Sequence, residues 1–386
     1  MTPRKVLFVT GTRADFGKLK PLLAAVRGAP ELDCHVFATG MHTLARYGMT
    51  VHEIEKAGFE NVVIHRNQTE EGHEPMDAVL AATVEGLGRH LRELGPDLLV
   101  VHGDRVEALA GATVGALNNA LTAHVEGGEV SGTVDELIRH AVTKLSHLHF
   151  VANPLAARRL VQLGELPESV FVIGSPEVDV MLGPALPALE EVRRKYEIRF
   201  LRYVIFAYHP VTTELAGLRD RIAGIVAALE ESGHEFVVIY PNNDPGSEAV
   251  LEALRALEGH PRFRVLPSMR FEYFLTLLKH ARAVVGNSSS GVREAPVYGV
   301  PTIDLGTRQR NRHELASIRR VPEERAALAA ALAELPGRFA PALPFGAGGS
   351  GDGFLACLRR PELWATSAQK QFRDLDAGPS WRADAR

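Results

Sequence analysis

The chain has 386 residues, of which 46% are hydrophobic and 23% are charged, a composition typical of a folded globular protein and not of a disordered one. Lysine and arginine (43) nearly balance aspartate and glutamate (47), so the net charge of −4 provides no basic field for bulk nucleic-acid binding. Two cysteines require no disulfide framework, and no apolar run reaches the roughly 18 residues of a membrane-spanning helix. The opening residues lack the apolar stretch of a signal peptide, so we expect a cytoplasmic protein.

The first half of the chain alternates apolar strands with helices. We expect strands at residues 6–10, 35–39, 97–102, 122–125, 149–152 and 170–173. Apolar residues at helical spacing predict a helix over 16–27, and an alanine-rich run predicts another over 107–117. Because the strands are continuously apolar instead of alternating, they predict a parallel sheet covered by helices on both faces.

A cluster of glycine and proline at 174–187 is typical of a linker, and the pattern starts again after it. The second half carries predicted strands at 203–208, 235–240, 264–266, 283–286 and 302–305, and predicted helices over 213–232 and 271–280. A Gly/Pro-rich segment at 341–353 precedes a helix-like stretch over 354–375 and a polar tail over 376–386. The predicted fold class is therefore α/β, with two domains of similar size.

Polar side chains gather directly after the predicted strands. Six strand ends carry such groups, at residues 11–13, 102–105, 126–129, 209–213, 241–244 and 286–291. Ligands of open parallel sheets bind beyond the carboxyl ends of the strands. Because these groups occur in both halves, we expect one cleft between two facing domains.

The segment from Gly286 to Glu294 combines glycines with hydroxyl residues at a strand-to-helix turn. Backbone N–H groups at such a turn bind phosphate, although a helix N-cap with spare serines explains the same pattern equally well. Glu294 could accept hydrogen bonds from the two hydroxyls of a ribose, or be a solvated helix residue. Arg13 and Arg308 each follow a glycine at a strand end, and two such guanidinium groups favour a diphosphate site.

Four carboxylates form an acidic group in the loops of the first domain: Asp104, Glu126, Glu129 and Asp135. Paired carboxylates can divide general acid and base roles when their environments separate their pKa values. His209 adds a hydrogen-bond donor from the second domain. In the alternative, structural interpretation, Asp104 pairs with Arg105 or Arg139 and Glu126 caps a helix.

Several enzyme classes are disfavoured by missing motifs. The segment Gly11–Gly17 is not a GxGxxG fingerprint, and neither a GxxxxGK[ST] phosphate loop nor a GxSxG nucleophile elbow occurs. His140, His147 and His149 lack the partners that a metal site requires, so polar contacts between elements explain them better. We therefore expect no metal and no cofactor.

Long motifs in both halves resemble those of a known family. They lie at residues 11–16, 102–105, 124–136, 138–147, 209–214, 242–247, 286–294 and 306–309. In these motifs the chain resembles the hydrolysing UDP-N-acetylglucosamine 2-epimerases, which supply N-acetylmannosamine for sialic acid. The resemblance extends from about residue 5 to about residue 375. Non-hydrolysing relatives read differently at the loops that hold Glu126 and Asn287–Ser289 here, which favours the hydrolysing type.

The resemblance implies the GT-B architecture, in which two Rossmann-like parallel-sheet domains face a central cleft. We expect residues 1–178 to form the first domain, completed by a C-terminal helix at about 361–375 that crosses back to it, and residues 179–360 to form the UDP-binding domain. The implied catalytic residues are Asp104, Glu126, Asp135 and His209. The implied UDP-sugar contacts are Arg13, Arg105, Asn242, Ser288, Ser289, Glu294 and Arg308. The family also implies a homodimer or homotetramer.

The implied reaction has two steps: anti elimination of UDP to give 2-acetamidoglucal, then syn addition of water. The residues leave open which carboxylate takes the C2 proton. They also leave open the sugar, because close relatives act on UDP-2,4-diacetamido-2,4,6-trideoxyglucose for legionaminic acid. The polar loop at 66–77 is either a specificity element or a surface loop. A GT-B glycosyltransferase and a non-catalytic nucleotide-sugar binder remain alternatives of other classes.

Overall fold

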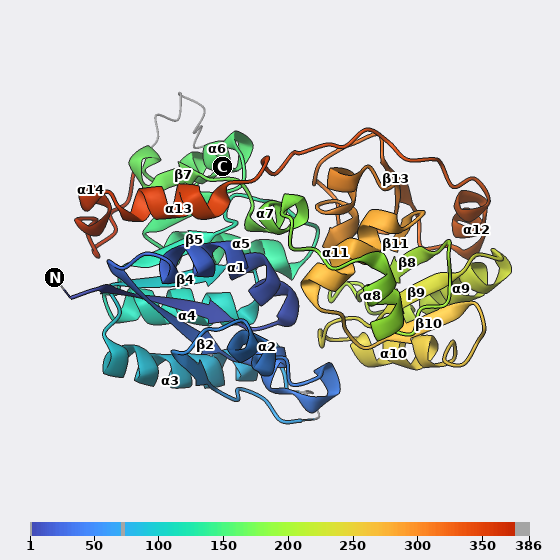
Figure 1. Cartoon of the computed structure of the whole chain (residues 1–386), viewed down its shortest axis with the longest axis horizontal. Coiled ribbons are helices and arrows are strands. Elements are labelled where there is room, and N and C mark those ends of the chain that lie inside the picture. The colour runs from blue at the N-terminus through green and yellow to red at the C-terminus, as the bar shows by residue number, and fades with distance from the viewer. Residues whose placement is uncertain (1, 71–73, 375–386) are drawn as a thin grey trace, which may run out of the picture.

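Two separate parallel sheets form the centres of the two halves of the chain (Figure 1). The structure is a computed structural model that describes residues 2–70 and 74–374. The first sheet has seven strands in the order β3-β2-β1-β4-β5-β6-β7. Its strands are β1 (Arg4–Thr10), β2 (Leu32–Ala38), β3 (Val62–Ile64), β4 (Leu98–His102), β5 (Thr122–Val125), β6 (Leu148–Val151) and β7 (Val170–Val172).

The second sheet has six strands in the order β10-β9-β8-β11-β12-β13, and every pairing in both sheets is parallel. Its strands are β8 (Val204–Ala207), β9 (Phe236–Ile239), β10 (Phe263–Leu266), β11 (Val284–Gly286), β12 (Thr302–Leu305) and β13 (Ile318–Val321). The short strands β3 and β13 lie at sheet edges, and the sequence pattern did not predict either of them.

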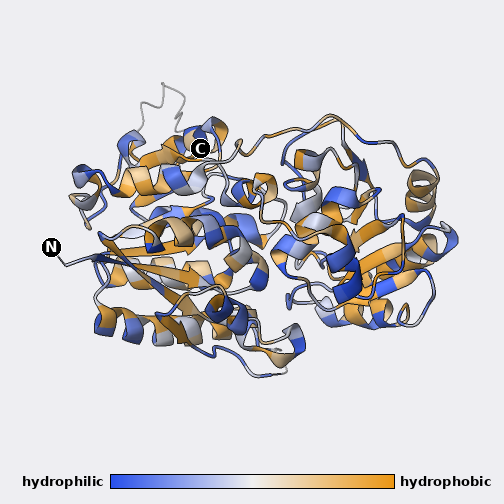
Figure 2. Ribbon diagram, in the orientation of Figure 1, coloured by the Kyte–Doolittle hydropathy of each residue, from blue (hydrophilic) through white to orange (hydrophobic). Residues whose placement is uncertain are grey.

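Helices cover both faces of each sheet, and Figure 2 shows apolar strands enclosed by helices with polar outer faces. The helices of the first half are α1 (Arg13–Arg27), α2 (Val51–Lys56), α3 (Met76–Leu94), α4 (Val106–Leu117), α5 (Val134–Leu145), α6 (Pro154–Gln162) and α7 (Pro176–Leu182). Those that follow are α8 (Leu189–Lys195), α9 (Leu218–Glu231), α10 (Ser247–Arg255), α11 (Phe271–His280), α12 (Arg325–Ala333), α13 (Ser350–Leu358) and α14 (Pro361–Trp364). No helix in the described parts of the chain is long and apolar enough to span a membrane.

The continuously apolar strand β1 explains why the sheet is buried on both faces. Val6 and Phe8 belong to one core cluster, together with residues of α1 and α13. Leu7 and Val9 point the other way, into a cluster with residues of α3 and α4. All four side chains are buried, so the hydrophobic effect drives helices onto both sides of the same strand.

The helix predicted over 354–375 is wrong in its extent. Helix α13 begins at Ser350, inside the segment predicted to be irregular, and ends at Leu358. Its N-terminus is capped by the Asp179 carboxylate, which accepts hydrogen bonds from the N–H groups of Ser350 (3.1 Å) and Gly351 (3.0 Å). Pro361 has no N–H and disfavours helical geometry in the residue before it, which separates α13 from the four-residue α14.

Helix α13, not a helix at 361–375, returns the chain to the first half. Figure 1 shows an extended segment leading from the second half to α13 (red), which lies over the first. Phe354 of α13 packs on the first sheet, with its ring 4.6 Å from that of Phe150 and 6.3 Å from that of Phe8. The domain boundary at 178/179 stays a prediction, and the tail predicted at 376–386 lies outside the described residues.

Candidate active site

A cavity of about 250 Å³ opens between the two halves, at the carboxyl ends of both sheets. Seven residues that the sequence predicted to bind or act on a UDP-sugar line it: Arg13, His209, Asn242, Ser288, Ser289, Glu294 and Arg308. Arg13 comes from the start of α1, whereas the other six follow strands of the second sheet. The expectation that strand-end groups from both halves meet in one cleft therefore describes their placement correctly.

The loop after β11 is fixed by a glycine and an asparagine. Gly286 has φ of +130°, and a Cβ atom there would lie 2.0 Å from the carbonyl oxygen of Ala207, so only glycine fits. The side chain of Asn287 joins this loop to its neighbour, because its Nδ2 donates to the His209 carbonyl (2.7 Å) and its Oδ1 accepts from the His209 N–H (2.6 Å).

The helix expected to follow this loop is only a 3-10 turn. The turn η4 covers Ser289–Gly291, and the Ser288 hydroxyl at its start accepts hydrogen bonds from the Ser290 N–H (3.4 Å) and hydroxyl (3.0 Å). Since a single turn carries little of the dipole of a long α-helix, an anion at this loop would depend more on its hydroxyls and on the adjacent Arg308.

His209 is a neutral imidazole with a defined tautomer. Burial is the main effect that holds its pKa well below the usual value, and the positive charges of Arg308 and Arg105 lower it further. Its Nδ1 accepts a hydrogen bond from the backbone N–H of Asn242 at 3.2 Å. In a neutral ring the other nitrogen then carries the proton, so Nε2 can donate to an acceptor in the cavity.

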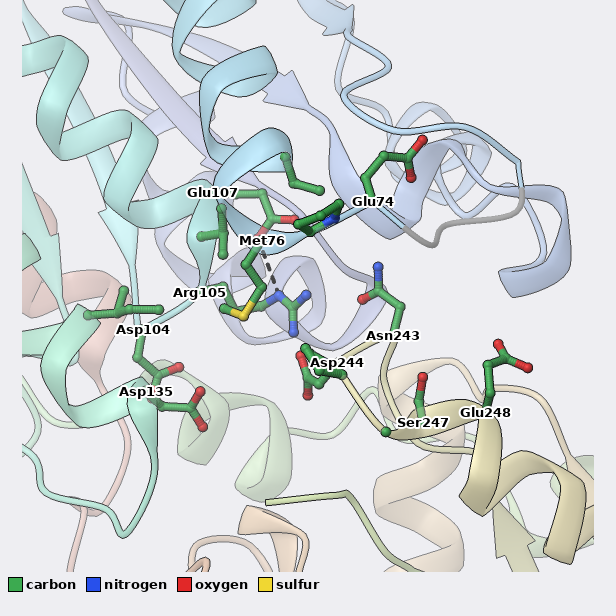
Figure 3. A pocket seen from close by; sticks show the side chains of 16 residues that line it. Glu74, Met76, Asp104, Arg105, Glu107, Asp135, Asn243, Asp244, Ser247 and Glu248 are labelled. Carbon is green, nitrogen blue, oxygen red and sulfur yellow. Dashed lines mark hydrogen bonds and ion pairs between the residues drawn. The ribbon is translucent and has the colours of Figure 1, made fainter. Parts of the chain in front are cut away.

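The predicted carboxylates Asp104 and Asp135 line a neighbouring cavity of about 220 Å³, together with Arg105 (Figure 3). The Asp104 side chain is 24% exposed and the Asp135 side chain 29% exposed, so both remain accessible to a ligand. Arg105 is held by Glu107, whose Oε2 lies 3.3 Å from its Nε. Asp104 pairs with the fully buried Arg139, which was the structural alternative considered from the sequence.

The two cavities are neighbours, and Arg308 and Asp135 lie between them. Arg308 lines the first cavity, Asp135 lines the second, and their charged atoms lie 3.3 Å apart. A backbone hydrogen bond from the Gly132 N–H to the Arg308 carbonyl (3.1 Å) brings the same two loops together. Groups suited to a diphosphate and groups suited to proton transfer therefore line two adjacent cavities.

Glu126 lies behind this site and lines neither cavity. Its side chain is 8% exposed and contacts His102 and Arg293, each at 2.9 Å. Its backbone adopts φ of +70°, a left-handed conformation that is uncommon for a glutamate. Burial alone would raise its pKa, but Arg293, Lys18 and His102 together hold it well below the usual value. Glu126 thus has an ionised carboxylate and a strained backbone, and it does not act as a helix cap.

Three cations around this carboxylate were not among the predicted site residues. His102 Nδ1 lies 2.6 Å from Asp15 Oδ1, and the two neighbouring carboxylates raise the pKa of His102 to about 9 against the effect of burial. Lys18 lies 3.2 Å from Glu294, and Arg293 directly precedes Glu294 in the chain. The sequence did place these cations next to motif residues, since His102 ends the strand before Asp104. Spacing alone does not show that they contact Glu126.

The three histidines considered as metal ligands contact other protein groups. His149 Nε2 lies 2.9 Å from a Glu165 oxygen, His147 Nε2 lies 3.0 Å from the Ala368 carbonyl oxygen, and His140 lies 3.5 Å from Glu136. Within residues 2–70 and 74–374, no group of three or more His, Cys, Asp or Glu side chains is arranged to hold a metal ion.

Two Rossmann-like domains that face a shared cleft define the GT-B class of protein, and the predicted architecture is confirmed. The family model described as UDP-N-acetylglucosamine 2-epimerase matches residues 24–359. The chain belongs to the UDP-N-acetylglucosamine 2-epimerase family, as its motifs indicated.

Individual relatives match about four fifths of the chain or more. A UDP-N-acetylglucosamine 2-epimerase of Neisseria meningitidis serogroup B is 47% identical, over 97% of this chain and all of the relative. A UDP-N,N'-diacetylbacillosamine 2-epimerase (hydrolyzing) of Legionella pneumophila is 31% identical, over 79% of this chain and 82% of the relative. The crystal structure of the Methanocaldococcus jannaschii UDP-GlcNAc 2-epimerase in complex with UDP-GlcNAc and UDP shares the fold, with a TM-score of 0.78 at 22% identity over 92% of this chain and 99% of that one.

Proposed function

We propose that the protein is a hydrolysing UDP-N-acetylglucosamine 2-epimerase, which converts UDP-N-acetylglucosamine and water to N-acetylmannosamine and UDP. The observation that carries the proposal is the contact between Arg308 and Asp135, 3.3 Å apart. It places a cation suited to the departing diphosphate beside a carboxylate that faces the second cavity. Elimination needs both groups within the reach of one sugar, because the C1–O bond and the C2–H bond break on neighbouring carbons.

The nucleotide half of the substrate fits the cavity lined by Arg13, Ser288, Ser289, Glu294 and Arg308. The guanidinium groups and serine hydroxyls would donate to the diphosphate, and His209 would add its Nε2 proton. Glu294 would accept hydrogen bonds from the ribose hydroxyls. One of its oxygens, Oε2, is buried and has no hydrogen-bond partner among the residues that the structure describes, which leaves it available for that contact.

In the first step a carboxylate removes the C2 proton while the C1–O bond breaks and UDP leaves with the bonding electrons. The product, 2-acetamidoglucal, then receives the oxygen of water at C1 and a proton at C2. A hydrogen next to an acetal is a poor acid, so leaving-group departure leads and the sugar gains positive charge. The carboxylates Asp104, Asp135 and Glu126 would stabilise that charge electrostatically.

The carboxylates divide by exposure into two roles. Asp104 and Asp135 line an open cavity, so we assign them to proton transfer with the sugar. Glu126 is buried and ion-paired, with a pKa held low by its neighbours, which suits an electrostatic role better than that of a base near neutral pH. Arg105, beside Asp104, would complete the contacts to the substrate from the first domain.

The Legionella relative, named as hydrolyzing, supports the hydrolysing type. The sugar has two candidates. The Neisseria relative at 47% identity favours UDP-N-acetylglucosamine, whereas the Legionella relative at 31% identity is named for UDP-N,N'-diacetylbacillosamine, a 2,4-diacetamido-2,4,6-trideoxy sugar. We retain this second sugar as an alternative substrate for the same chemistry.

Proton NMR of the enzyme with UDP-N-acetylglucosamine in deuterated water tests the proposal. We expect UDP release together with N-acetylmannosamine that carries deuterium at C2. UDP-N-acetylmannosamine formed without UDP release would instead place the protein in the non-hydrolysing class. If neither product forms, the same measurement with the diacetamido sugar decides between a change of substrate and a nucleotide-sugar binder without catalysis.

A homodimer or homotetramer remains a proposal taken from the family, and a cytoplasmic location remains a proposal taken from the sequence. Light scattering coupled to size-exclusion chromatography measures the assembly directly. A glycosyltransferase would require an acceptor and would transfer the sugar to it instead of releasing free N-acetylmannosamine, so the NMR experiment also separates that alternative.

A further inference from the structure

Arg293 lies at the point where the nucleotide loop of the second domain meets the acidic loop of the first. It directly precedes Glu294 and follows the turn η4 that begins at Ser289. Its side chain does not enter the cavity but runs into the protein, where the residue is 2% exposed. No step of the proposed reaction uses it, yet it is among the largest fully buried side chains.

The guanidinium group of Arg293 binds in two directions at once. Its Nη1 contacts Glu126 (2.9 Å) and also pairs with Glu129, both in the loop after β5. Its Nε (2.8 Å) and Nη2 (2.6 Å) both donate to Glu177 at the start of α7, and Nη2 also donates to the Ser175 hydroxyl (2.8 Å). One side chain therefore connects the nucleotide loop, the acidic loop and the segment that links the domains.

The shape of the arginine explains why this position suits no other cation. The guanidinium group is planar and carries N–H groups on separate edges. It can therefore bind Glu177 through Nε and Nη2 while Nη1 contacts Glu126. Phe345 lies against the guanidinium at 4.3 Å and favours its flat geometry. A lysine ammonium carries the same charge as a single point and would pair with one of these carboxylates at the expense of the other.

We propose that Arg293 is a positioning residue that holds Glu126 from across the domain boundary, so that the nucleotide loop and this carboxylate are assembled as one unit. The inference rests on the proposed function, because it assigns Glu126 an electrostatic role in that reaction. Lys18 extends the same connection, since it lies 3.2 Å from Glu294 and 3.8 Å from Glu177. Glu294, the candidate for binding the ribose, and Glu126, the candidate for stabilising the sugar, thereby belong to one network of ion pairs.

The backbone conformation of Glu126 explains why contacts from other elements are needed to fix its position. A glutamate at φ of +70° is strained, and such a conformation persists only when its surroundings fix it. The charged and titratable groups that face it come from several elements, namely Lys18 of α1, His102 of β4, His124 of β5, Glu129 of its own loop, Glu177 of α7, Arg293, and Arg312 between β12 and β13. Arg293 and Arg312 come from the nucleotide-binding half, and Arg293 contacts the Glu126 carboxylate directly, at 2.9 Å.

The test is Arg293→Lys, with Glu177→Gln as a second variant and Arg338→Lys as the control. Glu177→Gln leaves the Arg293 charge in place but weakens the hold on one edge of its guanidinium. Arg338 is exposed and donates to the backbone carbonyls of Lys279, Ala281 and Tyr298, and it lines neither cavity of the cleft. The measurements are UDP affinity by calorimetry, kcat and KM for UDP-N-acetylglucosamine, and the pH dependence of kcat.

For Arg293→Lys we expect kcat to fall on the order of 10- to 100-fold, which is the size of effect seen when supporting contacts of a site are lost. UDP affinity should stay within about threefold, because the nucleotide cavity is unchanged. The acid limb of the plot of kcat against pH should move to higher pH, because the pKa of Glu126 rises when the guanidinium group no longer contacts it. Glu177→Gln should shift kcat in the same direction by less, and Arg338→Lys should match the wild type.

Two results would overturn the inference. In the first, folded Arg293→Lys keeps wild-type kcat and pH profile. In the second, kcat and UDP affinity fall by the same factor with an unmoved pH profile, which would make Arg293 only a support of the nucleotide loop. If Arg293→Lys does not fold, an unchanged kcat and pH profile in Glu177→Gln overturns it equally. If the wild-type protein turns over neither sugar, the proposed function is refuted. That outcome differs from the two above, which refute the role of Arg293 in an active enzyme.

Discussion

Replacing His102 by glutamine should make the pH dependence of stability flatter than in the wild type. His102 is buried between two carboxylates, at 2.6 Å from Asp15 and 2.9 Å from Glu126. Burial opposes its charge, but the two carboxylates outweigh that effect and raise the pKa of the ring from 6.5 to about 9. Glutamine keeps part of the hydrogen-bonding capacity and removes the charge.

The size of the effect follows from the difference between the folded and unfolded pKa values. A rise from 6.5 to about 9 corresponds to a stabilisation of about 3 kcal/mol, since each tenfold change in an equilibrium constant is worth about 1.4 kcal/mol. The folded state holds the proton more tightly, so this stabilisation is complete below pH 6.5. It is lost as the pH rises through 9, where the folded protein also releases the proton.

The assay is urea denaturation of the wild type, His102→Gln and the control His52→Gln at several pH values from 6 to 10. His52 is a surface residue whose side chain is 58% exposed, so its replacement should change little at any pH. The difference in unfolding free energy between wild type and His102→Gln should be largest at pH 6 and smaller by about 3 kcal/mol at pH 10. A difference that stays constant across this range would refute the assignment of a charged His102.

Three further predictions concern the cleft. Asp104→Asn should keep UDP affinity within a few-fold of wild type while UDP release slows by at least about 100-fold, and near-normal turnover would remove Asp104 from the mechanism. Gly286→Ala, whose Cβ would lie 2.0 Å from the Ala207 carbonyl oxygen, should lower the melting temperature by several degrees and weaken UDP binding, whereas Gly337→Ala, with open space around its Cβ, should not. Arg308→Ala should weaken UDP binding by roughly 10- to 100-fold in calorimetry, and an affinity unchanged from wild type would contradict its assignment to the diphosphate.

The sequence predicted the parts of the fold that depend on local patterns. Strand β1 could be predicted because burial on both faces requires a continuous run of apolar residues. The turn after β11 could be predicted because its positive φ requires a glycine, Gly286. The predicted helix over 213–232 shows the limit of this reasoning. The helix begins only at Leu218, since Gly217 adopts a left-handed conformation that the apolar spacing does not report.

Features that depend on distant partners could not be predicted. Helix α13 begins in a glycine-rich segment because Asp179, from α7, caps it, and that cap is separated from it by 171 residues. The same limit applies to the site. Candidate residues were found from their positions after strands, but the pairing of Glu126 with His102 and Arg293 requires knowledge of which strand ends face each other.

The placement of the carboxylates links the two-domain fold to the proposed chemistry. Asp104 and Asp135 pair with Arg139 and Arg308, yet their side chains stay accessible from a cavity, whereas Glu126 is enclosed. An enclosed anion exerts its field at low dielectric, where it acts more strongly than the same charge in water, but it cannot exchange protons with solvent easily. A reaction that builds positive charge on a sugar and also moves protons needs both kinds of group. Since Arg293 and Arg308 come from the nucleotide domain, the full set of carboxylates is held in this arrangement only while the two domains face each other.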